Sequence, residues 1–185
     1  HKRFVKYLRD AGYTAHSDPE IHQAFDLTYD YDGFEYLEDF FRGQGELKDY
    51  LSYLFIQETL YPQHAIKLRF LENHDIDRIA NIIPDKKTLQ NWVTFYTLLP
   101  GTILVWAGQE IMVKKRTDFF EREVIDWEKG DYEFCEFFKE AIRTAKEIKR
   151  KGKRFMIEEL KPGVVKITWQ GVAEEFTKVL NLGLK

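Results

Sequence analysis

Apolar residues recur at helical spacing in four stretches of the chain. In one of them Leu89, Trp92 and Tyr96 lie three and four positions apart, which places them on one face of a helix. Glycine or proline follows each stretch, and both residues commonly end helices. The predicted helices cover residues 4–8, 36–60 with an interruption near 43–45, 86–99 and 131–149.

Short apolar runs lie between these helices. Continuous runs of this length are typical of strands that are buried on both faces of a parallel sheet. The predicted strands cover residues 24–29, 66–71 and 102–106. Strands that alternate with helices in this way predict an α/β fold.

The pattern changes after Lys151. Three short β-rich runs follow, at residues 155–160, 164–169 and 176–182, and turn-forming residues separate them at Pro162-Gly163 and at Gly171. This arrangement predicts an antiparallel β meander. We therefore divide the chain into a β/α region, residues 1–150, and the start of a β domain, residues 151–185.

The β/α region holds too few strands for a complete fold. A closed parallel barrel needs about eight strands, and an open sheet of three would be small for an independent domain. We therefore expect the β/α region to be the last part of a larger unit.

Polar side chains follow the predicted strand 66–71 at once. Asn73, His74 and Asp75 end it, and Arg78 lies three residues further on. Side chains at the carboxyl end of a parallel strand point into the mouth of the sheet or barrel, where such folds keep their chemistry. An amide, an imidazole and a carboxylate suit sugar hydroxyls or a developing positive charge. A turn and helix cap is the alternative, because Asn and Asp are good capping residues.

The composition bounds these hypotheses. A hydrophobic fraction of 44% and an aromatic fraction of 16% can build a real core, and a net charge of −3 gives no general attraction to nucleic acid or to anionic membranes. The lone Cys135 excludes an internal disulfide, and no spacing of Cys and His resembles a zinc site. No apolar run reaches the roughly 20 residues of a membrane span. The absence of a signal peptide favours a cytoplasmic location, although the abrupt start at His1 is typical of a cut piece.

Four stretches resemble the α-amylase family, glycoside hydrolase family 13. The stretch from Phe70 to Asp75, with Arg78, is similar to the motif at the end of that family's seventh barrel strand. The other three stretches, similar to the sixth strand, the eighth strand and the segment that follows it, are 25–32, 100–110 and 119–127. Their order and spacing agree with the family. The resemblance implies the last three strands and helices of a (β/α)8 TIM barrel, followed by an antiparallel β meander from a C-terminal β-sandwich domain.

The resemblance also shows which catalytic groups these 185 residues do not carry. Family members have a nucleophilic Asp after the fourth strand and a general-acid Glu after the fifth, and neither pattern occurs here. Retaining glycosidases need both carboxylates. We therefore expect the chain to belong to a hydrolase or transglycosidase that acts on α-glucosidic bonds of starch, glycogen or related α-glucans, and to be inactive alone.

The family assigns roles to the residues of the strand-end motif. By this resemblance, Asp75 would hydrogen-bond the sugar at the cleavage point and stabilise the oxocarbenium-like transition state. His74 would donate to a hydroxyl of the same sugar. For Arg78 three alternatives stay open: contact with a neighbouring sugar, pairing with a carboxylate, or exposure to solvent.

Further residues are candidates for the cleft or its support. Tyr29, Asp30 and Asn73 would line the cleft, although turn formation explains Asp30 equally well and Asn73 suits a structural role. Gln109 and Glu110 are expected to support the site. The resemblance assigns no cofactor and no metal to this chain, because the family's calcium ligands lie mainly upstream.

The expected partner is an α-glucan or oligosaccharide, with neither nucleic acid nor a membrane. The alternative function is a non-catalytic carbohydrate-binding or assembly domain derived from the family. A stripe of exposed Trp and Tyr on the meander would favour the carbohydrate-binding domain. We also expect self-association through the exposed barrel edge, where apolar side chains would lack partners. These side chains belong to Phe25, Leu68, Phe70, Leu104 and Trp106.

Overall fold

The computed structural model describes residues 2–116, 118, 120–121 and 124–184. The chain forms two compact units, His1–Leu68 and Arg69–Lys185. No helix among the described residues is both long enough and apolar enough to cross a membrane. The predicted division after residue 150 stays a prediction.

The first unit alternates helices with two strands. Its elements are α1 (Lys2–Asp10), α2 (Asp18–Ile21), β1 (Leu27–Tyr29), α3 (Tyr31–Phe41), α4 (Leu47–Leu60) and β2 (Ile66–Arg69), whose last residue falls in the second unit. The predicted helix over 36–60 is two helices, and Gly43, with φ of +69°, lies between them. The backbone there adopts a left-handed conformation that glycine allows without strain.

β1 and β2 pair in parallel, as predicted. Leu27 is opposite Ile66 and Tyr29 is opposite Leu68, so these four side chains share one face of the pair. β1 is shorter than the predicted strand over 24–29, because the N–H groups of Ala24 and Phe25 donate to the Ile21 carbonyl and extend the turn after α2.

The second unit begins at the end of β2 and contains most of the core. Its elements are α5 (Ile79–Ile82), α6 (Lys86–Leu98), β3 (Thr102–Ile103), the 3-10 turns η1 (Gln109–Ile111) and η2 (Trp127–Lys129), α7 (Tyr132–Lys151), β4 (Arg154–Lys161), β5 (Val164–Gln170) and β6 (Glu175–Asn181). The segment 119–127 that resembles the α-amylase family lies partly outside the described residues.

β3 is shorter than the predicted strand over 102–106. Beside it the Leu104 N–H donates to the Arg69 carbonyl at 2.8 Å. The Trp106 N–H then turns to the side chain of Gln109, at 3.2 Å from Oε1. The apolar run therefore continues beyond the strand, which ends after two residues.

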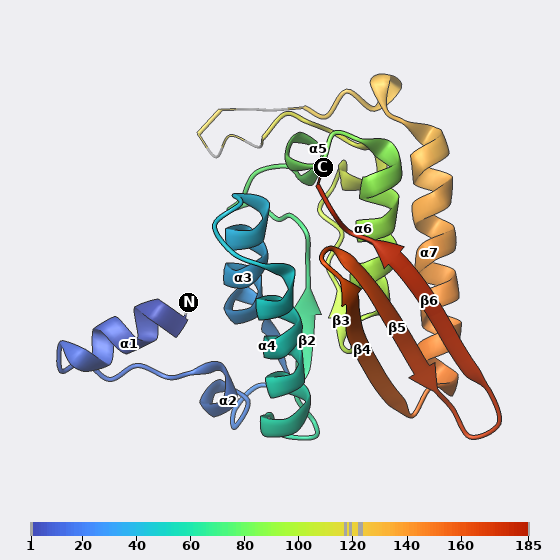
Figure 1. The fold of residues 1–185 in the computed structure, drawn as a ribbon. Coiled ribbons are helices and arrows are strands. Elements are labelled where there is room, and N and C mark those ends of the chain that lie inside the picture. The colour runs from blue at the N-terminus through green and yellow to red at the C-terminus, as the bar shows by residue number, and fades with distance from the viewer. Residues whose placement is uncertain (1, 117, 119, 122–123, 185) are drawn as a thin grey trace. The chain divides into compact units, whose positions relative to one another are not determined.

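Helices α6 and α7 lie side by side in this unit (Figure 1). Trp92 and Tyr96 of α6 and Phe134 and Phe138 of α7 are almost completely buried, and the rings of Tyr96 and Phe138 meet edge to face. Asp131 caps α7 by accepting from the Phe134 N–H at 2.9 Å. The apolar stripes predicted from periodicity are therefore the core faces of both helices.

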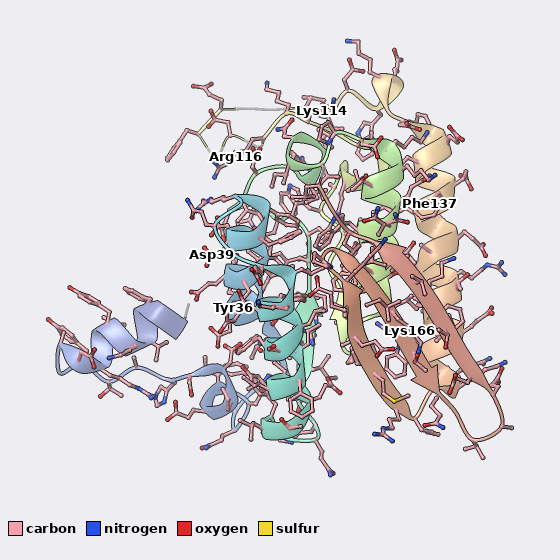
Figure 2. The ribbon with its side chains drawn as sticks, viewed as in Figure 1. Tyr36, Asp39, Lys114, Arg116, Phe137 and Lys166 are labelled. Atoms are coloured by element: carbon pink, nitrogen blue, oxygen red, sulfur yellow. The ribbon has the colours of Figure 1, made fainter. Side chains whose placement is uncertain are left out.

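The predicted meander is confirmed. β4, β5 and β6 form an antiparallel sheet in that order, with Val165 and Ile167 fully buried. Lys166 of β5, labelled in Figure 2, is opposite Glu158 and pairs with it at 2.9 Å. The indole N–H of Trp169 donates to the Leu98 carbonyl at the end of α6, which ties the sheet to the helical layer.

The apolar side chains expected to lack partners differ in their environment. Phe25 is 63% exposed, whereas Phe70 is 4% exposed. The expectation was wrong for Phe70, because it is buried in the core of the second unit. Leu68, Leu104 and Trp106 are half-buried.

Candidate functional site

The turn after β2 is held by its own side chains. The Asp75 N–H donates to Asn73 Oδ1 at 2.9 Å, and the Asn73 side chain is buried. Asn and Asp commonly form such turns by bonding backbone groups two residues on. Asn73 therefore orders the turn, in keeping with the structural role weighed for it from the sequence.

His74 and Asp75 present their side chains at the surface of this turn. Their side chains are 41% and 53% exposed, and His74 Nε2 lies 3.3 Å from Asp75 Oδ1. The imidazole also lies against the indole of Trp106, with ring centroids 5.7 Å apart. The site therefore offers a carboxylate, an imidazole and an apolar ring side by side.

A buried ion pair lies beneath the turn. Arg78 Nη1 donates to Glu72 Oε1 at 2.7 Å, and the second oxygen of Glu72 accepts from the Ile79 N–H at 2.7 Å. The two charged side chains are 4% and 0% exposed. Burial raises the pKa of Glu72, while the hydrogen bonds from Arg78 and from the Ile79 backbone oppose that rise.

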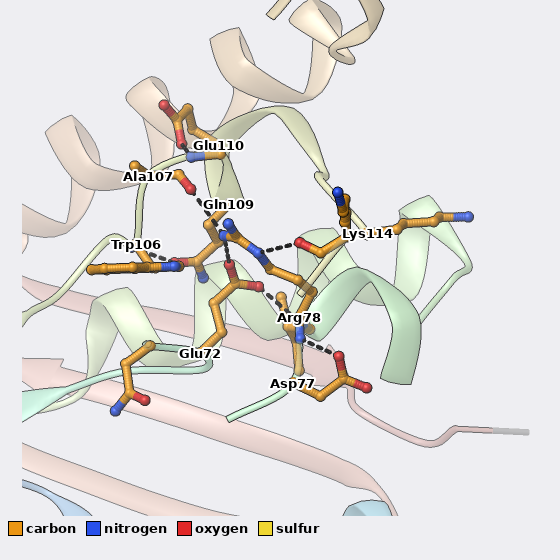
Figure 3. Close-up of polar contacts among 12 residues, drawn as sticks. Glu72, Asp77, Arg78, Trp106, Ala107, Gln109, Glu110 and Lys114 are labelled. Atoms are coloured by element: carbon orange, nitrogen blue, oxygen red, sulfur yellow. Dashed lines mark hydrogen bonds and ion pairs between the residues drawn. The ribbon is translucent and has the colours of Figure 1, made fainter. Parts of the chain in front are cut away.

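Arg78 joins two strand-end segments. Figure 3 shows its guanidinium between Glu72 and the carbonyl of Ala107, which accepts from Nη1 at 2.9 Å. Nε donates to the carbonyl of Lys115 at 3.1 Å. Of the alternatives left open by the sequence, the structure therefore has the pairing with a carboxylate, and the predicted contact with sugar stays a prediction.

The segment after β3 turns sharply at Gly108. Its φ of +92° is a left-handed conformation, and a Cβ there would lie 2.8 Å from Val113 Cγ2. Gln109 is buried, and Glu110 accepts from the Gly108 N–H at 2.8 Å. Both side chains therefore hold the turn that carries Trp106, as expected of supporting residues.

Cationic residues follow this turn. Arg116 Nη2 donates to the backbone carbonyl of Asp75 at 2.8 Å, and Figure 2 labels Lys114 and Arg116 in the same segment. A cavity of about 570 Å³ lies nearby, with Trp106 and Arg78 in its lining. Sequence reasoning missed both features, because only the folded chain brings residues 106–107, 111–115 and 124–126 around one cavity.

The two cleft candidates of the first unit differ in exposure. Asp30 is 3% exposed, and its Oδ1 accepts from Gln57 Nε2 at 2.7 Å. A Cβ on Gly33 would lie 2.7 Å from that carboxylate, so glycine is needed there. Tyr29 is 39% exposed and stacks on Tyr31, with ring centroids 5.7 Å apart. The predicted cleft-lining role of both residues stays a prediction.

A buried polar network in the first unit was also missed from the sequence. Lys67 forms an ion pair with Asp18, and its Nζ donates to Thr28 Oγ1 at 2.8 Å. His22 Nε2 lies 3.0 Å from the same hydroxyl, and Tyr61 faces the Lys67 ammonium. No group of three or more potential metal ligands occurs among the described residues.

Comparison with known proteins relates the chain to α-amylases. Alpha-amylase 2 of Dictyoglomus thermophilum is 28% identical over 134 residues, which are 66% of this chain. A solved α-amylase from Lactobacillus plantarum is 30% identical and matches 97% of the chain with a TM-score of 0.80. A noncanonic maltogenic α-amylase from Thermotoga neapolitana is also 30% identical and matches 89% with a TM-score of 0.80. No family model matches the chain.

The chain spans only part of each relative. It covers 24% of the Dictyoglomus protein, 43% of the Lactobacillus structure and 40% of the Thermotoga structure. The similarity therefore describes a region of those proteins and extends through both compact units of this chain.

Proposed function

Because this chain belongs to the α-amylase family, we propose that it supplies part of the active site of a glycoside hydrolase or transglycosidase. The substrates would be α-glucosidic bonds of starch, glycogen or related α-glucans. The observation that carries this proposal is the surface turn where His74 lies beside Asp75 and against the Trp106 indole.

Asp75 is the proposed transition-state stabiliser. Its side chain is half exposed on the turn after β2, so a sugar can reach it. A preorganised negative charge stabilises the positive charge that develops on a sugar ring during glycosidic cleavage. His74 would donate a hydrogen bond to a hydroxyl of the same sugar, and Trp106 would pack against an apolar sugar face.

The other candidates have supporting or peripheral roles in this proposal. Asn73 orders the turn, and the buried Arg78 positions it through Glu72. Tyr29 and Asp30 would line the cleft from the preceding strand end. The proposed architecture is the last three strands and helices of a (β/α)8 barrel, followed by the first strands of a β-sandwich domain.

The nucleophile and the general acid would come from the part of the barrel that these 185 residues do not contain. Retention requires that pair of carboxylates on either side of the scissile bond. The chain alone is therefore proposed to bind glucan without cleaving it.

The test is Asp75→Asn in the protein that carries the whole barrel. The change is nearly isosteric and removes one charge, so the fold should stay intact. Turnover on an α-1,4-linked glucan should fall by about 100-fold or more, the scale of one lost electrostatic stabiliser. KM should change less, because an interaction that strengthens in the transition state is lost mainly from kcat.

Asp77→Asn is the matched control. Asp77 lies two residues away, and its Oδ1 accepts from the Arg78 N–H at 2.8 Å and from Asn81. The control removes the same charge from the same turn. Turnover should stay within about threefold of the unmodified protein, since Asp77 contacts no sugar in this proposal. Equal loss in both variants, or full activity of Asp75→Asn, contradicts the proposed role.

A further inference from the structure

A second pocket lies at the start of β3, where Gly101 and Thr102 are part of its lining. It shares no lining residue with the turn that carries His74 and Asp75. Its volume is about 320 Å³, within the range of roughly 300–1,000 Å³ typical of small-molecule sites. The lining combines the end of α6, the turn that leads into β3 and the last turns of α7, two helices that lie side by side in Figure 1. Polar lining residues include Thr97, Thr102, Lys146, Lys149 and Arg150.

The lining is cationic and contains no carboxylate. Three of the six cations of α7 lie outside the pocket, and each pairs with a carboxylate: Lys139 with Glu136, Arg143 with Glu140 and Lys151 with Glu174. Among the described residues, the three in the pocket make no such pair. The three cations of α7 that form no ion pair among the described residues therefore all line this one pocket.

Lys149 is the most enclosed of the three. Its ammonium donates to the Gly101 carbonyl at 3.2 Å, and its side chain is half-buried. The buried Arg69 lies close by, and its Nε donates to the Pro100 carbonyl at 2.9 Å. Burial and the charge of Arg69 lower the pKa of Lys149 to about 8. A bound anion would relieve both effects.

The helix dipole alone does not explain this arrangement. Cations in the last turn of a helix are favourable, and α7 ends in Lys149, Arg150 and Lys151. The dipole effect requires neither a pocket nor a second cation from another element. Lys149 instead donates to Gly101, outside its own helix, and lies beside Arg69.

We propose that this pocket binds a phosphate group, either free or as the monoester of a small hydroxylated molecule. A dianion matches several converging cations better than a single carboxylate does, and Lys and Arg are the usual phosphate ligands. The pocket is larger than a phosphate ion, which leaves room for an attached carbon skeleton beside the Thr97 and Thr102 hydroxyls. The site is independent of the glucan chemistry proposed above.

The test is isothermal titration calorimetry of the protein with inorganic phosphate and with glucose 6-phosphate, both at the same constant ionic strength. Glucose is the uncharged control ligand. We expect saturable binding of at least one phosphate ligand, and about tenfold or greater weakening in Lys149→Gln and in Arg150→Gln, because each lost charge-assisted hydrogen bond is worth that much. Arg150 is exposed, so its variant tests the site even if Lys149→Gln unfolds.

Lys151→Gln is the matched control. It removes the same charge from the same helix turn but outside the pocket, so affinity should change by less than about threefold. Binding should also raise the pKa of Lys149, followed through the NMR shift of its Cε, because a bound anion favours the protonated amine. The proposal is overturned if neither phosphate ligand shows saturable binding. It is also overturned if Lys151→Gln weakens binding as much as the pocket variants do, or if glucose binds as tightly as the phosphate ligands. Binding of only one phosphate ligand identifies the source of the group.

Discussion

The guanidinium of Arg78 organises a surface turn from beneath. It connects Glu72, just before the turn, to backbone carbonyls of the segment after β3. A buried pair of this kind gives little net stability relative to apolar residues, but removing one partner leaves an uncompensated charge. We infer that the Arg78–Glu72 pair serves mainly to fix the position of the turn that carries His74 and Asp75.

This argument predicts the effect of Arg78→Met. The free energy of unfolding should fall by about 3–5 kcal/mol near neutral pH, because the Glu72 carboxylate stays buried without its cation. Burial already raises the folded pKa of Glu72, and loss of Arg78 should raise it further. A raised pKa means that the folded protein holds the Glu72 proton more tightly than the unfolded chain does. The stability that this proton contributes is fully present below the pKa of Glu72 in the unfolded chain. It is lost as the pH rises through the pKa of Glu72 in the folded protein. Urea unfolding should therefore show a larger deficit near about pH 8 than near about pH 5.

Arg143→Met is the control for this prediction. Arg143 and Glu140 pair at 2.8 Å on the surface of α7, with side chains 68% and 56% exposed. Exposed pairs contribute about 0–1 kcal/mol, so the control should lose no more than that at either pH. A deficit of Arg78→Met that does not grow with pH would contradict the assigned burial of Glu72.

At the residue scale, the sequence predicted the exposed polar side chains of the site better than the buried ion pairs. The motif pointed to His74 and Asp75, and both occupy a surface turn. Pairing of Arg78 with a carboxylate was only one of several alternatives, because an arginine near a strand end can face inward or outward. The pair of Lys67 and Asp18 was missed, since its partners are 49 residues apart and no local pattern links them.

At the scale of elements, α6, α7 and the strands of the meander were predicted more closely than the strands of the β/α region. The helical stripes of α6 and α7 carry their own evidence in the periodicity of their apolar residues. Strand length depends on pairing with a neighbour, which a single apolar run does not reveal. β3 therefore ends after Ile103, although Leu104 and Val105 continue the apolar run.

The joint between α7 and β4 gives a prediction at this scale. Gly152 lies against Trp169, and a Cβ there would stand 2.5 Å from Cε3 of the indole. Its φ of −68° is open to any residue, so Gly152→Ala tests the contact alone. We expect a loss of about 1–3 kcal/mol in thermal unfolding, the usual cost of overpacking.

Lys153→Ala is the control for the joint, because Lys153 is exposed and its backbone N–H keeps its bond to the Gln170 carbonyl. Its stability should change by about 0.5 kcal/mol or less. Unchanged stability of Gly152→Ala would mean that the indole can move away without loss.

The sheet of the first unit bears on the behaviour of the whole molecule. Leu27, Tyr29 and Ile66 share one face of β1 and β2 and are 42%, 39% and 41% exposed. The other face carries the half-buried Thr28, which accepts a hydrogen bond from the buried Lys67. An apolar face beside an open strand edge favours association with another chain.

We therefore predict self-association of the 185-residue chain through this face. Light scattering at tens of micromolar should give a mass above the monomer, and Leu27→Lys should shift it toward the monomer. Leu60→Lys is the control, because Leu60 is 71% exposed at the end of α4 and belongs to neither strand of the pair. A monodisperse monomer of the unmodified chain contradicts the prediction.

The indole bonds of the second unit have a further consequence. Trp92 donates to the Leu182 carbonyl and Trp169 to the Leu98 carbonyl, so each links α6 to the meander from one side. Neither sheet nor helix can separate while both bonds persist, and the two should therefore unfold as one cooperative unit. Since tryptophan emission moves to longer wavelength in water, the protein carries its own optical reporter of that separation.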